Sequence, residues 1–306
     1  TGNVLRYLQR AGTAADGGPI FKDLGEVRLE GFPYEEFDAY SYHAVVAVTR
    51  EGADADLLVS RGSSVGLFEF TGYKEGKPGF RLSHWLSGKD VSTRGYNFTE
   101  ILKDQKGRRY LLENDNEWSF RELLTAGGKV RLSSTVHPLN DQNGRFQVEG
   151  ETDSVHGEKW GFHRAVLWDF DGSGKQHLIV STDKGLLFLL REEQPLGSGG
   201  KFEFRSSGPL ADETGKVIRI YNRLAAAPLD LNGDGREDLV LAGATYQMGG
   251  EKNPGCGIYY SLNLGVDGDG RPRLSAIKTL ETVGHEHPSF VNGHAQLQTL
   301  DLEGKG

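Results

Sequence analysis

Residues 224–243 read LAAAPLDLNGDGREDLVLAG, and the spacing of their polar side chains decides how the rest of the chain is interpreted. Four oxygen-bearing side chains stand at relative positions 1, 3, 5 and 9 of a tight loop: Asp230, Asn232, Asp234 and Asp238. Gly233 and Gly235 lie between them, where the backbone must turn sharply. Ca²⁺ takes roughly six to eight hard oxygen ligands, and the backbone carbonyl of Arg236 adds one to the set. The spacing therefore predicts a calcium-binding loop.

The residues on either side of this loop predict β-strands rather than helices. The runs AAAPLDL and DLVLA are short and apolar, and Pro228 would break a helix that led into the loop. An EF-hand would need a bidentate Glu at position 12, which is Leu241 here. The loop is therefore expected to join two strands.

The strand that follows the loop recurs along the chain. The run DLVLAG at 238–243 has counterparts in DLLVSR at 56–61, YLLEND at 110–115 and HLIVST at 177–182, at spacings of 54, 67 and 61 residues. Each run is preceded by one short apolar segment and followed by two more, and none shows helical periodicity. Repeating units of four short strands predict an all-β fold, a β-propeller of four-stranded antiparallel blades. Inner strands are expected near 44–48, 98–102, 165–169, 224–229 and 295–300.

Four blades are complete in the sequence, and partial blades stand at both ends. Residues 1–30 have the pattern of the outer two strands of a preceding blade, and residues 294–306 begin the inner strand and loop of a following one. We expect a single propeller domain over residues 1–306, belonging to a longer parent chain with six or seven blades.

Composition excludes some classes of partner. The formal net charge of the 306 residues is −8, so no global basic surface is available for nucleic acid. No apolar run approaches the roughly 20 residues that span a bilayer, so no membrane span is expected. Cys256 is the only cysteine, which excludes an internal disulfide and leaves the redox compartment open.

The repeat resembles the FG-GAP or VCBS family, found in the propellers of integrin α-subunits and in many secreted bacterial proteins. The matching residues are DLNGDGREDLVLAGA at 230–244 and, more weakly, DFDGSGKQHLIVST at 169–182 and LDLEGKG at 300–306. The chain departs from the family pattern at Tyr221-Asn222, where the family has Phe-Gly, and at Gly243-Ala244-Thr245, where it has Gly-Ala-Pro. The resemblance implies a structural Ca²⁺ and an extracellular, cell-surface or periplasmic location.

A second loop of the same kind lies at 169–177. Its candidate ligands are Asp169, Asp171 and Ser173, but His177 stands at the ninth position, where a hard cation prefers oxygen. Two interpretations stay open: a weaker Ca²⁺ site, or a turn that only retains the family sequence.

Three other polar loops are expected to hold no ion. The loops TREGADAD at 49–56 and LKDQKGRRY at 102–110 have lost the alternating pattern of ligands. The stretch DGDG at 267–270 lacks a following DLxV strand, and type I′ turn chemistry in a hairpin explains it.

The loops that lead into each first strand form the face opposite the predicted calcium loops, here called the leading-loop face. Asp169, Asp230 and Asp301 are equivalent, and counting back seven residues from each reaches Phe162, Arg223 and His294 on one rim. The candidates for proton transfer and carboxylate binding there are His163, Tyr221, Arg223 and His294. Further candidate ligand-binding residues are Arg94, Tyr96, Arg164 and Asn222. Such groups suit a sugar site, while packing at the mouth of the channel is the alternative.

These observations favour a calcium-stabilised extracellular propeller whose leading-loop face binds a ligand, with polysaccharide as the first choice. One alternative is a catalytic polysaccharide lyase or glycosidase that uses the same face, with an Arg on the uronate carboxylate and a His or Tyr as base. A second alternative is an integrin-like adhesion module with a protein partner. Whether the chain is an enzyme stays open, because one propeller fold hosts many functions.

Overall fold

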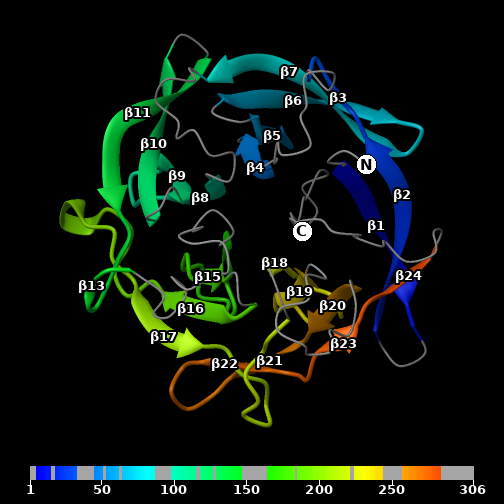
Figure 1. The fold of residues 1–306 in the computed structure, drawn as a ribbon, viewed down its shortest axis with the longest axis vertical. Coiled ribbons are helices and arrows are strands. Elements are labelled where there is room, and N and C mark those ends of the chain that lie inside the picture. Colours follow the sequence, from blue (N-terminus) through cyan, green and yellow to red (C-terminus); the bar gives the residue numbers. More distant parts are fainter. Residues whose placement is uncertain are drawn as a thin grey trace, which may run out of the picture.

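The computed structural model describes residues 5–14, 18–32, 45–50, 53–61, 64–86, 98–114, 118–126, 129–146, 164–182, 185–220, 224–243 and 257–283. Four antiparallel sheets stand around a central axis in chain order (Figure 1). This arrangement is a β-propeller, so the predicted fold class is confirmed. Among the described residues there is no α-helix, and none of them forms a helix able to cross a membrane.

Each sheet is one blade, and its strands follow one another from the axis outward. The first blade comprises β4 (Val45–Arg50), β5 (Ala53–Arg61), β6 (Ser64–Lys74) and β7 (Lys77–Leu86). The second comprises β8 (Phe98–Lys103), β9 (Arg109–Asn114), β10 (Trp118–Ala126) and β11 (Lys129–Pro138). The third comprises β14 (Arg164–Leu167), β15 (Leu178–Ser181), β16 (Leu187–Arg191) and β17 (Arg205–Pro209). The fourth comprises β18 (Ala225–Leu229), β19 (Asp238–Gly243), β20 (Gly257–Ser261) and β23 (Lys278–Thr279).

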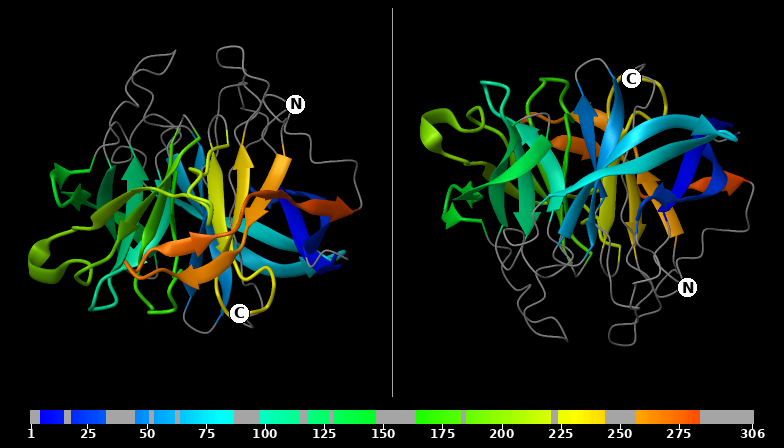
Figure 2. Two further views of the ribbon diagram at one scale, coloured as in Figure 1. Left: turned by 90° about the horizontal axis from the view of Figure 1, so that it is seen from below. Right: turned by 90° about the horizontal axis from the view of Figure 1, so that it is seen from above.

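The inner strands adjoin one another around the axis, β4 beside β8, β8 beside β14 and β14 beside β18. Side views show these strands running between the two faces of the ring (Figure 2). Small side chains permit this close approach, because Ala165, Ala225, Ala226 and Ala227 are all buried where blades converge. The four inner strands predicted within the described residues are confirmed, and the fifth, at 295–300, lies outside them.

The N-terminal hairpin lies between the first and fourth blades (Figure 1). Its strands β1 (Leu5–Thr13) and β2 (Pro19–Val27) are antiparallel, as predicted for residues 1–30. Phe21 packs with the fourth blade, whereas Val27 packs with the first, so the hairpin bridges both blades. Two pairings were not predicted from the sequence: β3 (Leu29–Glu30) runs parallel to β7, and β24 (Glu281–Val283) runs parallel to β2. The number of blades in a longer chain stays a prediction.

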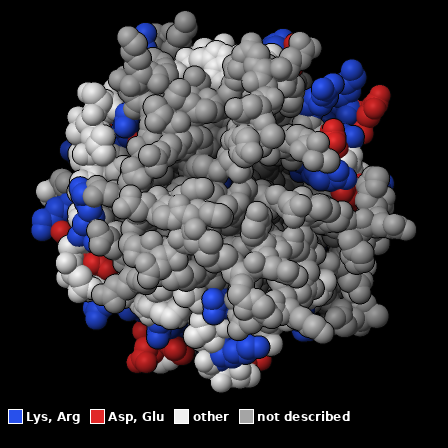
Figure 3. Space-filling view, in the orientation of Figure 1, with Lys and Arg blue, Asp and Glu red and all other residues white. Residues whose placement is uncertain are grey.

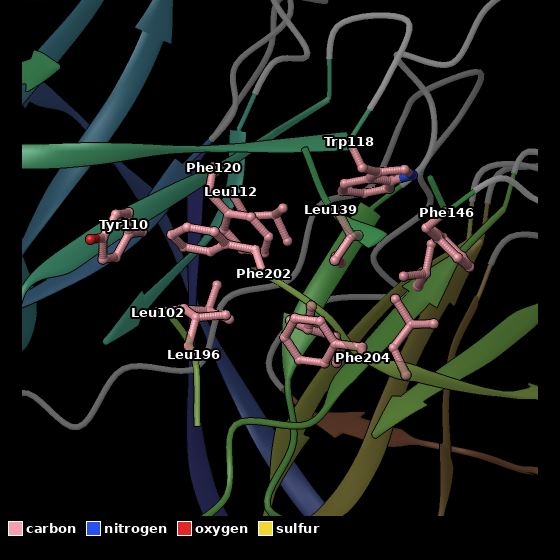
Figure 4. Packing of buried hydrophobic residues seen from close by; sticks show 14 residues of the cluster. Leu102, Tyr110, Leu112, Trp118, Phe120, Leu139, Phe146, Leu196, Phe202 and Phe204 are labelled. Atoms are coloured by element: carbon pink, nitrogen blue, oxygen red, sulfur yellow. The ribbon is translucent and has the colours of Figure 1, made fainter. Parts of the chain in front are cut away.

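Aromatic side chains fill the space between the second and third blades (Figure 4). The ring of Phe202 lies 4.9 Å from that of Tyr110 and 5.0 Å from that of Phe120, measured between ring centroids. The described residues also form two short hairpins and a turn of 3-10 helix: β12 (Asn140–Asp141) with β13 (Gly144–Arg145), β21 (Asn263–Val266) with β22 (Pro272–Leu274), and η3 (Ser198–Gly200). The packed interface between blades holds the loops at the ends of the inner strands in place.

Candidate cation-binding loops

The loop from Asp230 to Asp238 joins β18 to β19, as predicted. Both carboxylate oxygens of Asp230 face the backbone of the loop. Oδ1 accepts hydrogen bonds from the N–H of Gly233 at 2.7 Å and of Asp234 at 3.2 Å, and Oδ2 accepts one from Gly235 at 2.9 Å. Gly233 and Gly235 have φ values of 79° and 82°, the left-handed region that glycine adopts readily. The loop is therefore wound around the side chain of its first residue.

Asp234 carries the charge at the centre of the loop, and Arg236 neutralises it. The Oδ1 atom of Asp234 accepts a hydrogen bond from the backbone N–H of Arg236 at 3.0 Å, and Oδ2 accepts one from Nδ2 of Asn232 at 3.0 Å. The guanidinium of Arg236 also pairs with Oδ2. Burial would raise the pKa of Asp234, but the hydrogen bonds from Arg236 and Asn232 and the Arg236 charge hold that pKa below its ordinary value.

Asp238, at the ninth position, is fully buried. Its Oδ2 accepts a hydrogen bond from the N–H of Leu231 at 3.0 Å, and its Oδ1 accepts one from the N–H of Asn263 at 2.6 Å. Burial raises the pKa of Asp238, and the charges of Asp234 and Asp230 raise it further against the effect of the two hydrogen bonds. The loop thus concentrates carboxylates that repel one another.

The ninth position has the same structural role in three blades. In the third blade, Nδ1 of His177 accepts a hydrogen bond from the N–H of Glu192 at 3.0 Å. In the first blade, Oδ1 of Asp56 accepts one from the N–H of Phe70, also at 3.0 Å. Both contacts are equivalent to that between Asp238 and Asn263, because in each blade the donor lies one residue beyond the residue that stands opposite the ninth position. Sequence reasoning missed this role, although the shared Asp-Leu that begins DLLVSR and DLVLAG could have indicated it.

The loop at 169–177 has the same winding but a different charge. Asp169 Oδ2 accepts a hydrogen bond from the N–H of Gly174 at 3.0 Å, and Asp171 Oδ1 accepts one from that of Ser173 at 3.1 Å. The other oxygen of Asp169, Oδ1, is buried and has no hydrogen-bond partner among the described residues. A buried acceptor in this state suits a cation, because leaving it unpaired costs about 1–3 kcal/mol.

His177 presents a proton to this loop rather than a lone pair. Because Nδ1 accepts the hydrogen bond from Glu192, the proton of the neutral ring is on Nε2, which lies 3.5 Å from Oδ2 of Asp171. Burial lowers the pKa of His177 despite the nearby charge of Asp171, which favours this neutral form. The imidazole therefore cannot act as a metal ligand in this arrangement.

The two loops are hydrogen-bonded to each other. Oε2 of Glu237 accepts a hydrogen bond from the N–H of Asp169 at 2.9 Å, and the carbonyl of Glu237 accepts one from the indole N–H of Trp168 at 2.9 Å. The side-chain amide of Asn263 donates to the carbonyl of Phe170 at 2.8 Å and to that of Glu237 at 3.2 Å. The two candidate sites are therefore parts of one network.

A hard cation fits the donors present in both loops. The side-chain donors proposed are all oxygens, which is the set that Ca²⁺ prefers. Within the described ranges, no three His, Cys, Asp or Glu side chains form a group that could hold a metal ion. In the Asp230 loop the carboxylates are engaged by backbone N–H groups and by Arg236. The convergence of Asp230, Asn232, Asp234 and Asp238 on one point stays a prediction.

A carboxyl group near the axis was not predicted from the sequence. Glu100, on the inner strand β8, accepts hydrogen bonds from the N–H of Ile101 at 2.9 Å and from the N–H of Leu167 on β14 at 3.1 Å. Burial raises the pKa of Glu100 to about 7, and the charge of Glu237 adds to the shift. Glu100 therefore links two adjacent inner strands through a carboxyl group that titrates near neutral pH.

Most residues predicted on the leading-loop face lie outside the described residues: Arg94, Tyr96, His163, Tyr221, Asn222, Arg223 and His294. Arg164 is described, and it begins β14 with 7% of its surface exposed. Its carbonyl accepts a hydrogen bond from Oγ of Ser181 at 3.3 Å. The predicted depression shared by these side chains stays a prediction.

The stretch DGDG at 267–270 forms a hairpin turn between β21 and β22, as expected. The predicted turn type was wrong. A type I′ turn needs positive φ at both central residues, whereas in this turn only Gly270, which follows them, has positive φ, at 70°. Oδ1 of Asp267 accepts hydrogen bonds from the N–H groups of Asp269 and Arg271, both at 2.9 Å, which holds the central residues in the ordinary right-handed turn.

No protein-family model and no curated protein sequence matches this chain. The architecture of the ring and the local chemistry of its loops therefore carry the functional argument.

Proposed function

We propose that this chain is a calcium-stabilised β-propeller of the FG-GAP or VCBS type, and that its leading-loop face binds an acidic polysaccharide. The Asp230 loop carries the first part of the proposal. Its carboxylates at positions 1, 5 and 9 are wound into one turn between two strands, and Arg236 is the cation that pairs with Asp234. Burial raises the pKa of Asp238, and the charges of Asp234 and Asp230 add to the shift. A divalent cation would relieve this repulsion between the carboxylates.

The role of Ca²⁺ would be structural. Asp238 holds the loop to the start of β21 through Asn263, and Asp230 holds the glycine turns, so a cation bound by both would fasten the two ends of the loop together. In a secreted protein such a site needs only a modest affinity, with a dissociation constant of about 10⁻⁴–10⁻³ M. We infer an extracellular, cell-surface or periplasmic location from the resemblance of the loops to the FG-GAP or VCBS repeat.

Thermal unfolding with and without Ca²⁺ tests the calcium proposal. At a Ca²⁺ concentration about tenfold above the dissociation constant, binding should stabilise the folded chain by about 1.4 kcal/mol and raise the melting temperature. Asp234→Ala should remove most of this response. Asp267→Ala is a matched control, because Asp267 also caps a tight turn with two backbone hydrogen bonds but is expected to hold no ion. A wild-type melting temperature that is the same in chelator and in Ca²⁺ would contradict the proposal.

Chain topology supports the choice of the leading-loop face for a ligand. Each inner strand begins at one face of the ring and ends at the other, so β14 and β18 begin at the face opposite the two candidate loops. Arg223 directly precedes the buried start of the segment that leads into β18. On the rim seen in Figure 3, basic and acidic side chains of the described residues are intermixed. A single Arg is well suited to hold the carboxylate of an acidic glycan through paired hydrogen bonds.

Binding to uronic-acid polysaccharides tests the second part. Wild-type chain should bind an acidic glycan and not a neutral one, and Arg223→Ala should lose that binding while its melting temperature stays within about 2 °C. Lys216→Ala removes an exposed cation elsewhere on the surface and serves as control. Unchanged binding by Arg223→Ala would overturn this site, and absence of binding to any glycan would overturn the ligand. Absorbance of an unsaturated product would show that the face is catalytic.

A further inference from the structure

Asn263 connects the two candidate loops through one buried residue. Its backbone N–H donates to Oδ1 of Asp238 at 2.6 Å, and its side-chain amide donates to the carbonyl of Phe170 at 2.8 Å. Asn263 is fully buried, and its own Oδ1 accepts a hydrogen bond from the N–H of Gly265 at 3.0 Å, so the amide orientation is fixed. Holding Asp238 in place therefore also holds the second residue of the other loop.

Glu237 makes a second connection beside the first. It directly precedes Asp238, and its carboxylate accepts the N–H of Asp169, the first residue of the other loop. The indole of Trp168, fully buried, donates to the carbonyl of Glu237. Trp168 and the first two residues of the Asp169 loop, Asp169 and Phe170, are thus bonded to residues that flank or contact Asp238.

The Asp169 loop has a feature of its own that points to a ligand. Asp169 Oδ1 is buried without a hydrogen-bond partner among the described residues. The loop therefore contains a buried acceptor whose pairing the described chain does not complete, and a cation would complete it.

We propose that the Asp230 and Asp169 loops bind Ca²⁺ with positive cooperativity, coupled through Asn263 and Glu237. This inference rests on the proposed calcium function. A cation in the Asp230 loop restrains Asp238, Asn263 and Glu237, and these restrain the backbone at 168–170. The second cation then meets a loop that is already ordered, so less conformational entropy is lost when it binds. By reciprocity, the Asp169 loop assists the Asp230 loop by the same factor.

A comparable contact elsewhere provides a matched control. In the third blade, Gln176 precedes His177 as Glu237 precedes Asp238, and its amide bonds to the backbone of Lys103 in the second blade. That contact joins the Asp169 loop to a loop in which Arg108 pairs with Asp104, where no cation is expected. Removing Gln176 breaks a bond between neighbouring blades without touching the connection between the two candidate sites.

Isothermal titration of the chelator-treated full chain with CaCl₂ tests the coupling. Wild type should bind two ions. Asp171→Asn should leave only the Asp230 loop, and Asp234→Asn only the Asp169 loop. In each variant the remaining loop should bind at least about fivefold more weakly than the same loop does in wild type, at the lower end of measured coupling between sites.

The coupling residues give the deciding measurement. Glu237→Ala and Asn263→Ala should keep two ions but lose the cooperativity, while Glu237→Gln, which keeps an acceptor for Asp169, and the control Gln176→Ala should retain it. Glu237→Ala loses a single side-chain hydrogen bond, so it remains informative if Asn263→Ala does not fold. Two independent sites in wild type, or one bound ion, would overturn the coupling while leaving calcium binding intact. No bound ion would overturn the proposed calcium function and the coupling with it.

Discussion

Replacing Glu100 with Gln should make the stability of the propeller less dependent on pH. The carboxyl group of Glu100 lies on the inner strand β8 and accepts hydrogen bonds from Ile101 and from Leu167 on the neighbouring inner strand. Burial raises its pKa from 4.5 to about 7, so the folded chain holds a proton that the unfolded chain releases at lower pH.

The sign of the effect follows from proton binding. Between pH 4.5 and about 7 the folded state keeps the proton on Glu100 while the unfolded state has lost it, so the free energy of unfolding falls as pH rises through this window. Above about pH 7 both states are ionised and this contribution is constant. The difference in pKa corresponds to a loss of about 3 kcal/mol across the window.

Gln cannot ionise, so the variant should not show this loss. It offers one carbonyl acceptor, and one of the two backbone N–H groups loses its partner, which costs about 1 kcal/mol at every pH. Relative to wild type, Glu100→Gln should therefore gain about 2–3 kcal/mol between pH 5 and pH 8, measured by urea denaturation in chelator. Glu203→Gln, at a half-exposed side chain, should run parallel to wild type. An unchanged pH slope in Glu100→Gln would refute the assignment of the raised pKa to this group.

Three further substitutions test contacts that hold the loops. Asp56→Ala should destabilise the chain by about 1–3 kcal/mol in urea denaturation, because the N–H of Phe70 loses its acceptor. Asp56→Asn keeps an acceptor and should cost less, so equal effects of the two variants would contradict the role of the acceptor. Gly235→Ala should lower the free energy of unfolding by about 1 kcal/mol, because alanine disfavours the left-handed φ of this position. A Cβ there would meet no atom within 4 Å, so no steric clash adds to this cost, and a neutral result would show that the turn relaxes. Trp168→Phe should weaken the coupling between the two loops in calcium titration, and unchanged coupling would remove the indole from the connection.

The blades could be predicted because the sequence repeats at several levels together. The Asp-Leu-Val-Leu run of β19 and its counterparts locate the second strand of each blade, and the small residues of β18 locate an inner strand beside the axis. A repeat of this kind fixes strand order even where single strands are short. The prediction of the inner strands was accurate to within about one or two residues for this reason.

The outer parts of the blades were harder to predict because their contacts are not repeated. In the fourth blade the last of the four apolar segments is RLSAIKTL at 273–280, which the repeat predicts to be one strand. In the structure Pro272–Leu274 pairs with β21 and only Lys278–Thr279 pairs with β20. The interruption lies beside Leu262, whose backbone N–H donates to Oγ of Ser275 while its carbonyl accepts from the N–H of Ser275. The local sequence pattern did not indicate it.

The ninth position explains why the third blade keeps its fold with a histidine where the fourth has an aspartate. In both blades this side chain accepts a hydrogen bond from a backbone N–H just beyond the third strand, that of Glu192 for His177 and that of Asn263 for Asp238. Nδ1 of His177 accepts this bond as well as a carboxylate oxygen does. What the imidazole does not supply is negative charge. Among the candidate ligands, the Asp169 loop has two carboxylates, those of Asp169 and Asp171, while the Asp230 loop has three, those of Asp230, Asp234 and Asp238. Affinity for Ca²⁺ increases with the number of charged ligands, so the Asp230 loop should fill first. Through Asn263, an ion bound first in the Asp230 loop then orders the backbone of the weaker Asp169 loop before that loop binds its own ion.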